Sequence, residues 1–339
     1  MVKYYRAERA KGNEKIVKIG ITTTVPVEII YAAGHVPVDL NNRFITHNNP
    51  NSLVERAEIA GYPRNVCAWI KGIYTTVMEN KDIEAVIAVT QGDCSNTHAL
   101  METLELAGVK VIPFAFPFDR DYDLLRLQME KLMKQLGTGW EQVMRIKCRL
   151  DGVRKKVWLI DTMTWRDNLV TGWENHLYQV NCSDFKGDPE TFANEAQKFI
   201  ASVRGRRPAQ GLRIAYIGVP PIMDDLYDYL EERGARVVYN EVQRQFSMPF
   251  EVEDIVEMYR LYSYPYGIFY RLKDIQTELV RRQIDGVIHY AQSFCYRQIE
   301  DMIIRQKINL PVLTLEGDRP NRLDARTKLR IDAFLEMLK

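Results

Sequence analysis

The feature that most constrains the fold is an alternation of short apolar runs with helical patterns, which occurs twice along the chain. Strand patterns lie at residues 16–20, 35–40, 85–90 and 109–114, and again at 213–218, 235–239, 285–290 and 310–315. Helical patterns lie between them at residues 27–33, 64–79 and 96–107, and again at 221–233 and 296–306. Such alternation predicts parallel sheets covered by helices, because a parallel connection needs a crossover.

Matching landmarks in the two halves are separated by a nearly constant number of residues. Ile19-Gly20 corresponds to Ile217-Gly218, 198 residues later, and Cys94 corresponds to Cys295, 201 residues later. Ile112-Pro113 likewise corresponds to Leu310-Pro311. A fixed period indicates a structural repeat. We therefore predict an α/β fold with two doubly wound parallel-sheet domains that are related as a repeat.

The strand signal fades between the two halves. Helical spacing is present at residues 124–136, 140–156 and 189–203, followed by a basic stretch at 204–208 that is typical of a solvated linker. We predict a first α/β domain at 1–121, a helical insert or cap at 122–203, and a second α/β domain at 204–339. The last helix is expected at 324–338.

Composition narrows the class of partner. Hydrophobic residues make up 46% and charged residues 27% of the 339 residues, and the net charge is +1. This balance argues against a nucleic-acid or anionic-membrane partner. The chain has no apolar run of the roughly 20 residues that a membrane span needs, and residues 1–18 contain no apolar core of a signal peptide. Five widely spaced cysteines do not resemble a secreted disulfide framework, so we expect a cytoplasmic protein.

Common nucleotide motifs are missing from the sequence. It contains no G-x-x-x-x-G-K-[ST] and no G-x-G-x-x-G after a strand. If the activity uses ATP, a partner protein must therefore supply it.

Three cysteines lie where a loop leads into a helical pattern. These are Cys67, Cys94 and Cys295. Helix N-termini stabilise negative charge, so we expect lowered thiol pKa values at these positions. Ligands on separate loops of two domains suit a buried cofactor at a domain interface, and three thiolates could hold a [4Fe-4S] cluster with one open iron. Each cysteine taken alone could also be a small hydrophobic residue of the core. We interpret Cys148 and Cys182 in that way.

Several polar residues flank these positions. Thr22 and Thr23 follow the first strand and could position a substrate oxygen, or one threonine could cap the next helix. Glu28 could be a general base or a carboxylate that complements the helix dipole. Gln292 and Ser293 precede Cys295 and could serve the cofactor as a ligand or supporting donors, or could simply form a turn.

Sequence blocks around these residues resemble the 2-hydroxyacyl-CoA dehydratase and benzoyl-CoA reductase subunit family, in particular the D-component of 2-hydroxyglutaryl-CoA dehydratase. The blocks are Val25-Pro26-Val27-Glu28-Ile29-Ile30-Tyr31-Ala32-Ala33-Gly34, Asn65-Val66-Cys67-Ala68-Trp69-Ile70-Lys71-Gly72, Gly92-Asp93-Cys94-Ser95-Asn96, Ser293-Phe294-Cys295, Leu310-Pro311-Val312-Leu313 with Glu316-Gly317-Asp318, and Arg330-Ile331-Asp332-Ala333-Phe334-Leu335-Glu336. They span both α/β halves.

The resemblance implies two α/β domains, a helical insert and a [4Fe-4S] cluster held by Cys67, Cys94 and Cys295. It also implies a homodimer or a heterodimer with a related subunit, and an ATP-hydrolysing iron–sulfur activator that supplies low-potential electrons. Dehydratases of this kind act on acyl-CoA substrates by a radical mechanism, as lyases, whereas the reductases leave the electrons in the product and are oxidoreductases.

Two other functions remain open from the residues. The chain could be a non-enzymatic electron-transfer or maturation protein that carries the same cluster, or a metal-free protein that closes on a small molecule. The sequence leaves the substrate itself open.

Overall fold

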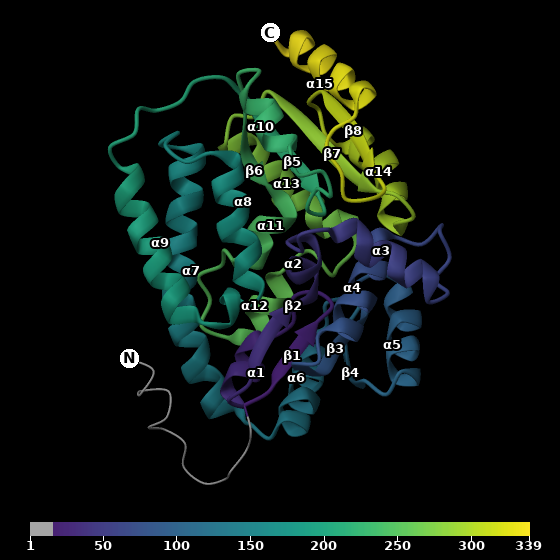
Figure 1. Ribbon diagram of the computed structural model, residues 1–339. Helices are drawn as coiled ribbons and strands as arrows, with labels where there is room; N and C mark the ends of the chain where they lie inside the picture. The colour runs from purple at the N-terminus through teal and green to yellow at the C-terminus, as the bar shows by residue number, and fades with distance from the viewer. Residues whose placement is uncertain (1–15) are drawn as a thin grey trace.

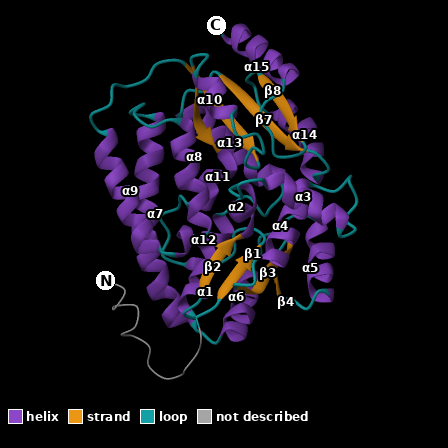
Figure 2. Cartoon of the chain, viewed as in Figure 1, coloured by secondary structure: helices purple, strands orange, loops and turns teal. Residues whose placement is uncertain are grey.

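In the computed structural model, which describes residues 16–339, two separate parallel sheets form the framework (Figure 1, Figure 2). The strand order is β2-β1-β3-β4 in the first sheet and β6-β5-β7-β8 in the second. The strands are β1 (Lys18–Ile21), β2 (Val36–Asp39), β3 (Ile83–Gln91), β4 (Lys110–Ala115), β5 (Leu212–Gly218), β6 (Ala235–Asn240), β7 (Gly286–Gln292) and β8 (Val312–Gly317). The identical order, with all pairs parallel, confirms the predicted α/β fold with repeated parallel-sheet units.

Helices flank both sheets. In the first half they are α1 (Val27–Ala32), α2 (Leu40–Ile45), α3 (Pro50–Ile59), α4 (Ala68–Glu79) and α5 (Asn96–Leu106). In the second half they are α10 (Leu226–Glu231), α11 (Glu241–Phe246), α12 (Ile255–Leu261), α13 (Ile268–Arg281), the 3₁₀ turn η3 (Tyr296–Ile299), α14 (Glu300–Lys307) and α15 (Ala325–Leu338). Figure 1 shows α15, in yellow, beside β7 and β8.

Four helices lie between the two sheets in sequence, and α7, α8 and α9 cover one side of the molecule (Figure 1). They are α6 (Tyr122–Leu136), α7 (Trp140–Trp165), α8 (Gly172–Val180) and α9 (Pro189–Val203), with the 3₁₀ turns η1 (Asn181–Ser183) and η2 (Phe185–Gly187) before α9. The proposed domain limits at 121/122 and 203/204 stay a prediction. The sequence analysis found no signal-peptide core in residues 1–18. Residues 1–15 of that segment lie outside the part of the chain that the structure describes.

The two halves of the chain contribute side chains to common hydrophobic cores. One core combines Ile19 and Ile87 of the first sheet with Met129 and Val157 of the insert and Tyr259 of α12. Another combines residues of α2, α3 and α4 with the second sheet. This shared burial holds the carboxyl ends of the two sheets at one region of the molecule. Within residues 16–339, every helix is too short or too polar to cross a membrane.

Two expected helices begin later than predicted. The helix expected at 64–79 starts at Ala68, which leaves Cys67 outside it as the N-cap residue. The helix expected at 221–233 starts at Leu226. Before it, Met223 forms an isolated bridge to Asn321, and the Asp224 N–H donates to the Asn321 carbonyl at 3.2 Å, which holds this segment in a non-helical conformation.

Candidate functional site

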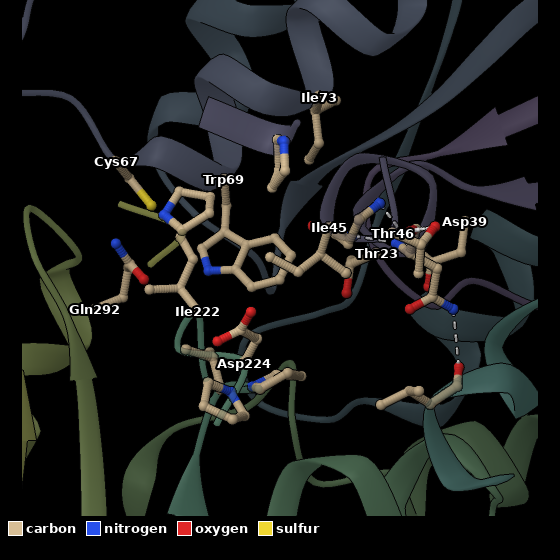
Figure 3. A pocket seen from close by; sticks show the side chains of 18 of the residues that line it. Thr23, Asp39, Ile45, Thr46, Cys67, Trp69, Ile73, Ile222, Asp224 and Gln292 are labelled. Atoms are coloured by element: carbon tan, nitrogen blue, oxygen red, sulfur yellow. Dashed lines mark hydrogen bonds between the residues drawn. The ribbon is translucent and has the colours of Figure 1, made fainter. Parts of the chain in front are cut away.

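A cavity of about 570 Å³ lies where loops from both sheets meet. Ligands of open α/β sheets bind outside the carboxyl ends of the strands, and this cavity occupies such a position in both halves. Its wall comes from segments that follow β1, β2, β3, β5, β7 and β8, and from α2, α4 and α8. Figure 3 shows Trp69, Ile222, Asp224 and Gln292 gathered around it.

The structure brings the three predicted cysteines to this one cavity. Cys67 precedes α4, Cys94 precedes α5 by one turn residue, and Cys295 is the N-cap residue of η3. All three line the cavity wall, with Cys67 almost fully buried. The other two cysteines, Cys148 and Cys182, are not part of the wall.

The expectation of lowered thiol pKa values is wrong. Burial raises the pKa of Cys67 to about 12 and that of Cys94 to about 11, and it also raises the pKa of Cys295. Backbone N–H groups of the following helix turn oppose this but do not overcome it. Negative charge on Cys295 and Cys94 would raise the Cys67 pKa further. Desolvation therefore outweighs the helix N-terminus.

Three thiols at one cavity are a donor set that suits an iron–sulfur cluster. In the part of the chain that the structure describes, no three His, Cys, Asp or Glu side chains surround a common point closely enough to hold one metal ion. Thiolates of an iron–sulfur cluster bind different irons and so need not converge on one atom. Buried thiols with raised pKa values can serve such a group, since metal binding displaces their protons.

A buried cation, Arg297, accompanies the cysteines, and the sequence analysis missed it. Its Nη2 donates to the Tyr264 carbonyl at 2.8 Å, and its Nη1 lies 3.2 Å from Glu300. The guanidinium charge opposes the burial that raises the pKa of Cys94 and Cys295. Arg297 lies in the first turn after Cys295, but only the folded structure shows that its side chain is buried.

A carboxylate of the same region, Asp93, precedes Cys94. Burial raises its pKa to about 6, and the Cys94 N–H and the Arg297 charge oppose that rise. Asp93 lines the cavity. The thiol region therefore combines one buried arginine with one perturbed carboxylate.

The threonines after β1 also line the cavity. The Thr22 hydroxyl accepts a hydrogen bond from the Val89 N–H at 3.1 Å, which ties the loop to β3. Figure 3 shows Thr23 in the wall near Asp39 and Thr46. The capping alternative is wrong, because Pro26 is the N-cap residue of α1 and no side chain caps that helix.

Glu28 lies in the first turn of α1, outside the cavity wall. It is fully buried, and its carboxylate pairs with Arg154 at 2.6 Å and accepts from the Tyr259 hydroxyl at 2.8 Å. A general base needs hydrogen-bond reach of its substrate. The general-base hypothesis for Glu28 therefore finds no support in this geometry, and Glu28 instead links α1 to α7 and α12.

Gln292 and Ser293 separate in the structure. Gln292 lines the cavity, where its Oε1 accepts from the Tyr290 hydroxyl at 2.7 Å and its Nε2 donates to the Asp318 carbonyl at 2.8 Å. Ser293 is outside the wall, and its hydroxyl donates to Glu316 at 3.0 Å. These bonds fix the backbone that leads to Cys295.

Helix α8 of the insert supplies part of the wall that the sequence analysis did not foresee. Trp173 and His176 stack with ring centroids 5.0 Å apart, and both line the cavity. Burial lowers the His176 pKa to about 3, so the ring is neutral at physiological pH. Its Nδ1 lies 3.2 Å from the Tyr227 hydroxyl. A capping signal at Thr171 and Glu174 marks the start of α8 in the sequence.

Comparison with known families covers almost the whole chain. A family model described as the D-component of 2-hydroxyglutaryl-CoA dehydratase matches residues 22–338. The matched range includes both sheets' carboxyl-end loops and the helical insert. No curated protein matches the chain. The resemblance seen in the sequence blocks is therefore confirmed.

Proposed function

Because the chain belongs to the 2-hydroxyglutaryl-CoA dehydratase D-component family, we propose that it is the iron–sulfur subunit of an enzyme that dehydrates a 2-hydroxyacyl-CoA. The observation that carries this proposal is the meeting of three cysteines, from both halves of the chain, at one cavity. In the proposal Cys67, Cys94 and Cys295 hold a [4Fe-4S] cluster. Such a group supplies a one-electron carrier and an iron open to an oxygen ligand.

The chain's own residues prepare the site for that group. The three thiols are protonated in the empty protein and release protons when they bind iron. Arg297 offsets part of the resulting negative charge. The Thr23 hydroxyl faces the cavity and is available to a substrate oxygen, while Thr22 and Gln292 hold the two loops on either side of it.

The proposal also includes partner proteins. Its sequence has no P-loop, so in this proposal an ATP-hydrolysing iron–sulfur activator supplies low-potential electrons. The subunit pairs with a second copy or with a related chain, in the cytoplasm. A benzoyl-CoA reductase-like reaction would use the same site but keep the electrons in the product.

A pure electron-transfer or maturation role fits the geometry less well. A relay needs its cluster near a surface, but it has no use for a ligand-sized space beside that cluster. Here a cavity of about 570 Å³ adjoins all three cysteines, which is within the usual size range of small-molecule sites. This favours an enzyme.

The test is the metal content of anaerobically prepared protein and two variants. We expect about four irons and four sulfides per chain, and loss or conversion of the cluster in Cys94→Ala. Cys148→Ala is the matched control, since Cys148 is an exposed cysteine outside the cavity, and it should retain full iron content. Unchanged iron in Cys94→Ala, or none in the wild-type protein, would overturn the proposal.

A further inference from the structure

The cavity wall carries an uneven set of charges. Its acidic residues are Asp39, Asp93 and Asp224. Among the residues of the wall that the structure describes, Arg322 is the sole arginine or lysine. A ligand that enters this space therefore meets acidic side chains but few basic ones.

Arg322 does not supply an inward positive charge. Its side chain is 77% exposed, and its Nε lies 3.3 Å from an Asp225 oxygen. The guanidinium is thus turned to solvent and already has an acidic neighbour. Arg297, the buried cation near the thiols, is held by Tyr264 and Glu300 and is not part of the wall.

The two histidines of the wall do not change this balance. His176 is neutral because burial lowers its pKa to about 3. His47 is exposed, and its Nδ1 already accepts from the Asn49 N–H at 3.1 Å. Neither ring is therefore poised to pair with an anion.

Asp39, which is buried, and Asp224, which is exposed, come from different segments of the cavity wall. Asp39 ends β2, with Oδ1 accepting from the Asn41 N–H at 2.8 Å. Figure 3 shows the Asp224 carboxylate directed toward Trp69, across from Cys67 and Gln292. A carboxylate on a ligand would be desolvated here without a cation to pair with, which is costly.

The wall combines neutral polar residues, such as Thr23 and Gln292, with apolar ones. The apolar residues include Trp69, Ile70, Ile73, Val219, Ile222 and Phe246. Resting on the proposed function, we infer that the site accepts a 2-hydroxyacyl thioester whose acyl chain is neutral and largely apolar, and that it discriminates against an acyl chain that ends in a carboxylate. This separates the chain from the dicarboxylic substrate in its family's name.

The test compares two unreactive thioesters that differ only at the end of the acyl chain. Pentanoyl-CoA ends in a methyl group and glutaryl-CoA in a carboxylate, and neither has the 2-hydroxyl that dehydration removes. Binding is measured by anaerobic calorimetry on the iron-loaded protein in its native oligomeric form. We expect pentanoyl-CoA to bind at least about tenfold more tightly, because the CoA part is common to both.

A variant pair locates the effect in the cavity. Asp224→Asn should narrow the ratio by improving glutaryl-CoA binding, whereas Asp228→Asn, an exposed acid outside the wall, should leave the ratio unchanged. Equal or tighter binding of glutaryl-CoA by the wild-type protein would overturn the inference but leave the proposed function intact. Binding of neither thioester would overturn the acyl-CoA assignment itself, and with it the inference.

Discussion

Gly72, in the middle of α4, offers a prediction in which two opposing effects can be weighed. A β-carbon at this position would overlap the ring of Phe44, well inside van der Waals contact. Phe44 is fully buried and packs edge-on against Trp69, with ring centroids 5.5 Å apart. The ring therefore has little freedom to move aside, and Trp69 lines the cavity.

The balance for Gly72→Ala comes from two magnitudes. Alanine is favoured over glycine inside a helix by about 1 kcal/mol. Overpacking a well-filled core costs about 1–3 kcal/mol. Because the clash is with a rigid ring held on its far side by Trp69, we expect the upper part of that range. The net effect is a loss of about 1–2 kcal/mol in the free energy of unfolding.

Urea unfolding followed by circular dichroism measures this difference. Gly152→Ala is the matched control, since Gly152 is an exposed glycine within α7 and an added β-carbon meets nothing within 4 Å. That variant should gain about 0.5–1 kcal/mol from helix propensity alone. If Gly72→Ala proved as stable as the wild-type protein while the control behaved as expected, the packing argument would be refuted.

Three further perturbations test the site and its supports. Arg297→Gln removes the cation near the thiols and should make the reduction potential of the iron-loaded protein more negative, on the order of 50 mV, in a spectroscopically monitored redox titration. Arg297→Lys keeps the charge and should shift the potential less. Equal potentials in both variants and the wild-type protein would contradict an electrostatic role for Arg297. Glu28→Gln leaves Arg154 buried without its main partner and should cost about 3 kcal/mol in chemical denaturation; a cost near zero would argue that the pair is dispensable. Burial and the neighbouring Asp39 charge raise the Asp184 pKa to about 7. Because the folded state then holds this proton more tightly than the unfolded state, Asp184 lowers the free energy of unfolding as pH rises from about 4 to about 7. Asp184→Asn should remove that part of the pH dependence, on the order of 4 kcal/mol. Parallel stability curves for variant and wild-type protein would rule this out.

The sheets were predictable because their strands are short, apolar and β-branched. Val86 to Val89 in β3 are completely buried, and the loops around them carry the glycines and polar residues that end strands. The repeat was also visible, since equivalent strands keep similar sequence separations. Topology then places the loops after β3 and β7 at comparable edges of their sheets, which is why Cys94 and Cys295 could be expected near a common site.

Side-chain environments were less accessible to sequence reasoning. A helix N-terminus suggested acidic thiols, but the depth of burial that reverses the shift depends on how the two halves pack together. Glu28 carried the pattern of a dipole-complementing residue, yet its partners Arg154 and Tyr259 are more than 100 residues away in the chain. In the same way, the start of the helix after β5 was displaced by a bridge to Asn321 that no local pattern encodes.

The division of the three cysteines, two before helices of the first half and one after β7 of the second, has a mechanical consequence. An inorganic core bound by all of them would act as a cross-link between parts of the chain that are 200 residues apart, much as a disulfide closes a long loop. Loss of that core, for example through oxidation by oxygen, would then remove a redox centre and also the cross-link between the two sheets.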